Sequence, residues 1–299
     1  MNSSDFAQVL VTGIASGSIY TLMGMGLFIT FLTTKALNFG QGDFLMIAAF
    51  LSMALTLTGL PVFASIPIVL AILAVLGILL ERVAIKPLSS ALAGSAGSFA
   101  WILTTLGFGM LLQNTATMVW GKSSFYSPPL FSSGDKKVIN LFGAGFYLEE
   151  LVVACVALCI IGALYWFLFR TRSGKEISAV AFDKPTAALL GINVRRTVMI
   201  SYVMMALLAA ISGILAGPIT TLQSHMGLLF ILKGFAVVSI GGFVNPLGIL
   251  IGGLGFGILE GTSNYIDSQF GDLYPYILVL GFLILRPSGL FGEARADVR

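Results

Sequence analysis

Apolar runs long enough to cross a membrane recur along the whole chain. A transmembrane helix needs about 20 consecutive, mostly apolar residues to cross the hydrocarbon layer. We predict such spans at residues 8–33, 43–60, 62–81, 98–119, 149–169, 197–217, 229–243, 246–266 and 273–287. A membrane β-barrel would show alternating segments of about ten residues instead. The sequence therefore predicts an all-α, polytopic transmembrane helical bundle of about 8–9 spans, with residues 1–299 forming one domain.

The scarcity of charge excludes an ordinary soluble domain. Only 10% of the residues are charged and 57% are hydrophobic, whereas soluble domains carry about 25% charged residues. The first apolar run follows a start without Lys or Arg, so it lacks the charged beginning of a cleavable signal peptide. We expect that run to be a retained span.

The chain lacks the side chains that membrane enzymes need. A membrane protease requires a nucleophile and a base inside the bilayer, but the only histidine, His225, lies in a loop. The Gly-Lys-Ser that follows Trp120 is not a phosphate-binding loop, because Ala116 replaces its first glycine. Cys155 and Cys159 offer too few ligands for a metal and are expected to act as small hydrophobic residues. We predict no catalytic residue, no metal site and no nucleotide site in this chain.

The basic residues predict the orientation in the membrane. Lys35, Arg82, Lys86 and the six bases of a loop at about 170–197 all follow odd-numbered spans. Cytoplasmic loops are enriched in Lys and Arg, so we expect these loops inside and a loop at about 120–148 outside, although the outer loop carries bases as well. The seventh run is short and ends in glycines, so it either crosses or only re-enters. With nine crossings, the C-terminal bases Arg286, Arg295 and Arg299 also lie inside. The bases of the outer loop are Lys122, Lys136 and Lys137.

A short capped helix is predicted inside the six-base loop. Asp183 is a good N-cap, Pro185 fits the first helical turn, and Gly191 can adopt the left-handed conformation that ends a helix. Ile177 and Val180, with the next alanine, predict another short amphipathic turn before it. Helices this short are not stable alone in water. The helix therefore packs on its own membrane domain, on anionic lipid headgroups, or on a cytoplasmic partner protein.

Two apolar runs are interrupted by glycines and an asparagine, at residues 37–50 and 238–253. Broken backbone at membrane depth is tolerated only where it is buried in protein or lines a cavity. Paired breaks in the two halves of a transporter point to its translocation path. The alternative interpretation is a tight turn between consecutive spans at the membrane edge.

Three charged residues are expected within apolar runs: Asp43, Lys233 and Glu260. Ionisable groups inside a membrane are costly and mark function by default. Each also has a structural interpretation. Asp43 can cap its helix or favour the positive end of that helix. Lys233 can extend its side chain to the interface, and Glu260 can reach the outer interface or a partner base.

Glycines spaced four residues apart predict close helix packing, because small residues at this spacing let helix backbones approach closely in lipid. These glycines are Gly13/Gly17, Gly213/Gly217, Gly248/Gly252 and Gly253/Gly257/Gly261.

Several segments resemble the permease subunits of branched-chain amino acid type ABC importers, in particular the LivH type. The resemblance covers almost the whole chain and is most specific in the loop around residues 173–196. The segments are "GSIYTLMGMGLFITF", "LNFGQGDFLM", "ERVAIKPL", "SGKEISAVAFDKPTAALLGINVRR", "KGFAVVSIGGFVNPLGILIGG" and "RPSGLFGE". Family members often carry a histidine before the acid of the first break, where this chain has Gln41.

The resemblance implies a multi-pass subunit of the bacterial inner membrane. Its partners would be a second, LivM-like permease subunit, two cytoplasmic ATPase subunits that bind ATP and Mg²⁺, and a periplasmic solute-binding protein. No cofactor would bind to this chain itself, and no nucleic acid would be a partner. The loop at 170–197 would contain the helix that couples the permease to an ATPase.

The resemblance also implies roles for two sets of residues. The residues expected to couple to the ATPase are Asp183, Lys184, Pro185, Thr186, Leu190 and Gly191. The residues expected along the substrate path are Asn38, Gln41, Asp43, Gly241, Gly242 and Asn245. A branched-chain or neutral amino acid is the expected substrate, and relatives use urea, amides and aromatic acids. The rival hypotheses are an ion-coupled secondary transporter or channel that uses Asp43 or Glu260, and a membrane scaffold without transport.

Overall fold

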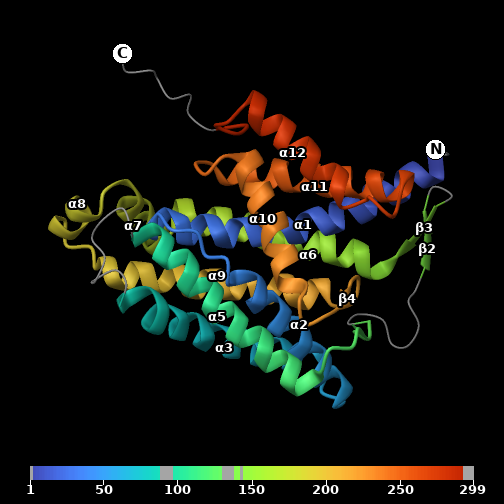
Figure 1. The fold of residues 1–299 in the computed structure, drawn as a ribbon, viewed down its shortest axis with the longest axis horizontal. Coiled ribbons are helices and arrows are strands. Elements are labelled where there is room, and N and C mark those ends of the chain that lie inside the picture. The colour runs from blue at the N-terminus through green and yellow to red at the C-terminus, as the bar shows by residue number, and fades with distance from the viewer. Residues whose placement is uncertain (1–2, 88–96, 130–137, 142–143, 292–299) are drawn as a thin grey trace.

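The computed structural model describes residues 3–87, 97–129, 138–141 and 144–291 and is almost entirely helical (Figure 1). Two short antiparallel pairs of strands accompany the helices: β1 (Phe125–Tyr126) with β4 (Thr221–Leu222), and β2 (Val138–Leu141) with β3 (Ala144–Tyr147). The helices are α1 (Ser3–Thr34), α2 (Gln41–Leu57), α3 (Val62–Leu80), the π-helical turn η1 (Glu81–Ile85), α5 (Gly97–Trp120), α6 (Leu148–Arg170), α7 (Arg172–Phe182), α8 (Lys184–Leu189), α9 (Val194–Ala216), α10 (Met226–Gly241), α11 (Pro246–Ile266) and α12 (Leu273–Leu285).

All nine predicted apolar runs are helices, but their lengths differ. In the described part of the chain, six helices are long and apolar enough to cross a membrane: α1, α3 with η1, α5, α6, α9 and α11. The helices α2, α10 and α12 are shorter, with 17, 16 and 13 residues. At 1.5 Å per residue, the shortest is about 20 Å long, less than the roughly 30 Å of hydrocarbon. The structure thus confirms an all-α polytopic bundle, in which six crossings have sufficient length.

The first helix is the centre of the bundle. It packs against α6, α9, α10 and α11, and 83% of its most apolar 18-residue stretch is buried. Its contact with α11 depends on the predicted glycines: a Cβ on Gly13 would lie 2.8 Å from the Cα of Ile258. Gly213 of α9 likewise faces the backbone of α2 at Leu45. These contacts confirm close packing at the glycine pairs of α1 and α11.

The chain re-enters the bundle after α1. Lys35 has a left-handed backbone, with φ of 58°, and the next five residues lead to α2. Gln41, the first residue of α2, donates from Nε2 to the carbonyl oxygen of Met23 at 2.8 Å. Met23 precedes the end of α1 by eleven residues, which is about 16 Å of helix. The first predicted break is therefore a helix that begins deep in the bundle and is not a turn at its edge.

The helix α10 lies differently from its neighbours. In Figure 1 it runs across the long direction of the bundle, whereas α1, α9 and α11 run along it. Gly227 at its start touches Gly42 of α2, and Gly234 further along lies against Met23 of α1. The short, glycine-bounded seventh run thus crosses the interior at an angle.

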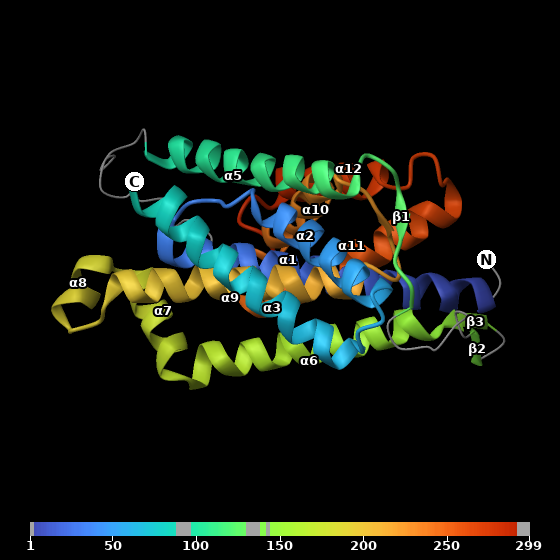
Figure 2. The same cartoon turned by 90° about the horizontal axis from the view of Figure 1, so that it is seen from below.

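The two ends of the bundle match the predicted grouping of loops. Figure 2 shows α7, α8 and the end of α1 at one end, with the N-terminus and the hairpin β2–β3 at the other. Lys35 and the six-base loop therefore share an end, as their positions in the sequence predicted. Lys136, Lys137, Arg295 and Arg299 lie outside the described residues.

Candidate functional site

The six-base loop is an ordered helical elbow between α6 and α9. Thr171 ends α6 and caps α7: its Oγ1 donates to the carbonyl oxygen of Phe167 at 2.7 Å and accepts from the backbone N–H of Gly174 at 3.1 Å. A Cβ on Gly174 would collide with the carbonyl oxygens of Phe167 and Leu168. A glycine at this position allows the chain to turn sharply out of the membrane helix.

The helix α7 is longer than the single amphipathic turn predicted for this stretch. It runs for 11 residues, with Ile177 and Val180 buried at 0% and 1% exposure. These side chains face the bundle, and α7 packs against α6, α9 and α1. The first turns of α7 were not predicted, because the residues from Arg172 to Glu176 are mostly polar and show no apolar periodicity. Because α7 packs against three helices of the bundle, a displacement of the loop would also displace those helices.

The predicted caps of α8 are confirmed. A carboxylate oxygen of Asp183 accepts from the backbone N–H of Thr186 at 3.1 Å and also from its hydroxyl group. Pro185 occupies the first turn, and Gly191 has φ of +84°. The backbone N–H of Ile192 donates back to the carbonyl oxygen of Ala187 at 3.0 Å, which closes the helix end.

The outer face of this elbow is apolar. Phe182, Leu189 and Leu190 are 95%, 89% and 76% exposed, whereas Ala187 on the other face of α8 is buried. Large apolar side chains grouped at a polar loop mark an interaction surface. Leu190 was among the predicted coupling residues, but Phe182 and Leu189 were not. The signal that could have found them is the presence of large apolar residues in an otherwise polar loop.

The first three predicted path residues lie at or just before the start of α2 and face different helices: Asn38 contacts Met205 of α9, and Gln41 contacts Met23 of α1. Asn38 and Gln41 are fully buried, and each has a side-chain oxygen without a hydrogen-bond partner. The carboxylate of Asp43 lies between Gly109 of α5 and Gly227 of α10; a Cβ on Gly227 would be 2.6 Å from its Oδ1. Asp43 does not cap α2, because Gly40 is the N-cap, but it does lie in the first turn of α2, at the positive end of the helix. The start of α2 thus places three polar side chains against α1, α5, α9 and α10.

The other three predicted path residues form a separate turn. Gly242 has φ of +82°, and Asn245 caps α11 by accepting from the backbone N–H of Leu247 at 3.0 Å. The two breaks contact different faces of α1, because Gly26 faces Gln41, whereas Gly24 faces Val238 and Ile249 of the second break. Residues two apart are about 200° apart around a helix. Phe235 of α10 lies between the two breaks, with its ring centroid 6.0 Å from that of Phe39 and 6.3 Å from that of Phe243.

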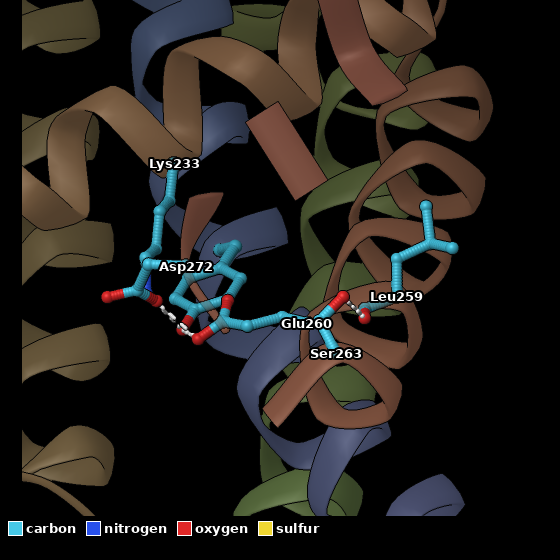
Figure 3. Close-up of polar contacts among 6 residues, drawn as sticks. Lys233, Leu259, Glu260, Ser263 and Asp272 are labelled. Carbon is cyan, nitrogen blue, oxygen red and sulfur yellow. Dashed lines mark hydrogen bonds and ion pairs between the residues drawn. The ribbon is translucent and has the colours of Figure 1, made fainter. Parts of the chain in front are cut away.

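The remaining intramembrane charges pair with each other. Figure 3 shows Lys233 of α10 directed toward Glu260 of α11 and Asp272 at the start of α12. The Nζ of Lys233 lies 2.8 Å from Glu260 Oε1 and 3.0 Å from Asp272 Oδ1. The hydroxyl of Tyr20 also donates to Glu260, at 3.0 Å. Lys233 therefore does not extend to the interface alone, and the structural interpretation of Glu260, pairing with a base, is confirmed.

Comparison with known proteins decides the class. The family described as "Branched-chain amino acid transport system / permease component" matches residues 9–285. This chain belongs to that family.

The relatives extend over nearly the whole chain. The permease protein LivH of Escherichia coli (strain K12), from a high-affinity branched-chain amino acid transport system, is 28% identical over 98% of this chain and 97% of its own. BraD of Pseudomonas aeruginosa, a permease of the same kind of system, is 26% identical over the same shares. Among solved structures, PsaBC from Streptococcus pneumoniae in complex with Fab has a similar fold, with a TM-score of 0.50, 15% identity, and 93% and 89% of the two chains covered. The chain is thus the membrane-spanning, non-catalytic permease component of an ABC importer.

Proposed function

We propose that this permease imports a branched-chain or other neutral amino acid, or a related small organic solute such as urea, an amide or an aromatic acid. Relatives named for branched-chain amino acid transport match nearly the full chain. No described group of His, Cys, Asp or Glu could hold a metal ion, and the polar groups at mid-bundle suit a small solute. The proposed location is the bacterial inner membrane, with α8 on the cytoplasmic side.

The observation that carries the coupling proposal is the exposed apolar face of a rigidly capped helix. Phe182, Leu189 and Leu190 would enter a groove of an ATPase subunit, and Asp183 and Gly191 would fix the shape of the helix that presents them. Lys184, Pro185 and Thr186 complete the coupling segment. Because α7 joins this helix to α1 and α9, closure of the ATPases on ATP and Mg²⁺ would tilt the helices that surround the mid-bundle polar groups.

The complete transporter would contain four further subunits or partners. A second, LivM-like permease would pair with this chain, two ATPases would bind at the cytoplasmic end, and a periplasmic binding protein would deliver the solute. Asn38, Gln41 and Asp43 are the proposed contribution of this chain to the path at mid-membrane. Gly241, Gly242 and Asn245 lie on another side of α1 and would act by allowing α10 and α11 to move.

Uptake of labelled leucine into proteoliposomes tests the function. The purified complex is reconstituted with ATP inside and the binding protein outside. Accumulation that needs both ATP and the binding protein supports the proposal. Stimulation of ATP hydrolysis by the binding protein without leucine uptake keeps the importer but rejects leucine as the solute.

The same vesicles test the ion-coupled rival. In that hypothesis, this chain alone would accumulate solute when an ion gradient replaces ATP. Lys233 and Tyr20 both contact Oε1 of Glu260, whereas the buried Oε2 has no hydrogen-bond partner among the described residues. The ion pair with Lys233 favours a structural role.

A further inference from the structure

A pocket with several charged groups lies behind the coupling helix, at the same end of the bundle. Its volume is about 530 Å³, larger than a small solute requires. It is formed between the end of α1, η1, the start of α5 and the junction of α8 with α9. Its polar lining residues are Thr34, Glu81, Lys86, Trp101, Lys184 and Arg195.

The charge of this pocket is positive. Three bases line it against one acid, Glu81, which is 4% exposed. In the described part of the chain, neither Lys184 nor Arg195 forms an ion pair. Burial lowers the pKa of Lys184, and the nearby charge of Lys35 adds to the effect. Lys184 and Arg195 thus share the pocket without an ion pair to its one described carboxylate, Glu81, and a bound anion would reduce the repulsion between their charges.

A neutral donor in the pocket wall also lacks a partner. The indole Nε1 of Trp101 is buried and makes no hydrogen bond among the described residues. An indole N–H can only donate, so the partner that it lacks is an acceptor. Two bases and a donor on different helices are the chemistry that recognises an oxyanion.

We propose that this pocket binds an anionic oxygen group, a carboxylate or a phosphate, between Lys184, Arg195 and the indole N–H of Trp101. The group can come from the headgroup of an anionic lipid or from a solute on the same side of the membrane. Lys184 belongs to α8 and Trp101 to α5. A bound anion would therefore hold the coupling helix against the bundle and oppose its movement. This inference does not depend on which solute is imported.

The tryptophan itself provides the measurement. Trp120→Phe and Trp166→Phe leave Trp101 as the only tryptophan of the three in the chain. The purified full-length chain is titrated with dihexanoyl phosphatidylglycerol, with dihexanoyl phosphatidylcholine as its uncharged comparison. A second titration uses the carboxylate isovalerate, with isovaleramide as its uncharged analogue. We expect a saturable change in Trp101 emission with at least one anion and with neither comparison compound, and the anion that acts identifies the source.

Matched variants separate the pocket from general surface charge. Arg195→Gln and Lys184→Gln should each weaken binding about tenfold or more, the usual effect of losing one charge-assisted hydrogen bond. Lys184→Arg keeps the charge and should restore most of the affinity, which excludes misfolding as the cause. Arg196→Gln removes a neighbouring base that does not line the pocket and should leave the affinity nearly unchanged. Absence of saturable binding by both anions, or an equal loss in Arg196→Gln, would overturn the proposal.

Discussion

Gly17 of α1 lies so close to Gly253 of α11 that a Cβ on Gly17 would be 2.5 Å from the carbonyl oxygen of Gly253. The obstacle is backbone, which cannot rotate away as a side chain can. In lipid, helix association depends on van der Waals packing of this kind. The contact between these two glycines therefore sets how closely the central helix and α11 approach.

Gly17→Ala should lower the stability of the solubilised protein by about 1–3 kcal/mol, the usual cost of adding a methyl group to a filled interior. Gly255→Ala is the matched control, because Gly255 also lies on α11 but a Cβ added there would meet nothing within 4 Å. The apparent melting temperature in detergent, followed by loss of the monodisperse peak on size exclusion, measures both. Equal melting temperatures for the two variants would contradict this account of the helix contact.

Gly191→Val should uncouple ATP hydrolysis from uptake. Gly191 has φ of +84°, a conformation that a β-branched residue avoids, so the end of α8 must change shape. We expect the complex to keep its ATPase activity while leucine uptake falls about tenfold or more. A tenfold fall corresponds to about 1.4 kcal/mol lost from the contact between α8 and the ATPase.

Gly59→Val provides the control for strain alone. Gly59 also has φ of +84° and open space around it, but it lies in the turn between α2 and α3. This variant should retain its ratio of uptake to ATP hydrolysis. A similar loss of coupling in both variants would show that strain anywhere in the bundle is sufficient.

Phe182→Ala should weaken the association with the ATPase subunits without affecting the fold. The side chain is 95% exposed in the isolated chain, so its removal leaves no cavity. Buried aromatic anchors at interfaces contribute about 2 kcal/mol or more, which is a factor of about 30 in affinity. Co-purification of the ATPases at increasing dilution measures the loss. Phe63→Ala, at a residue 92% exposed at the start of α3, should leave the association intact.

Glu260→Gln should destabilise the contact between α10 and α11. Breaking a buried ion pair by removing one partner costs about 3–5 kcal/mol, and Asp272 remains beside Lys233, so we expect about 3 kcal/mol. Thermal unfolding in detergent measures it. The double variant Glu260→Gln with Lys233→Met should lose less than the sum of the single variants, because contacting residues are coupled. Strict additivity would mean that the two charges do not interact.

Asp43→Asn should reduce uptake while the protein still folds. The carboxylate is enclosed by glycines from two helices, and the amide has nearly the same shape. Uptake and thermal stability are measured together, with Asp267→Asn, beyond the end of α11, as the control. Normal uptake by Asp43→Asn would remove this residue from the proposed path.

Local features of the sequence determined the apolar helices and the caps of α8. The apolar runs predict all nine apolar helices, because the membrane requires each span to satisfy its own backbone hydrogen bonds. The cap of Asp183 and the left-handed Gly191 depend only on neighbours within a few residues. The resemblance of whole segments to a permease family was likewise visible from the sequence and is confirmed by the family match.

Relations between distant segments were decided by the tertiary structure alone. Gln41 bonds to Met23 because α2 begins deep in the bundle. The apolar pattern of the sequence could not reveal this depth, because the hydrocarbon is equally apolar at every level. Lys233 meets Glu260 because α10 crosses the bundle at an angle, although the two residues are 27 positions apart. The sequence marks each residue as costly in a membrane, but the partner that offsets this cost depends on how the helices pack in three dimensions.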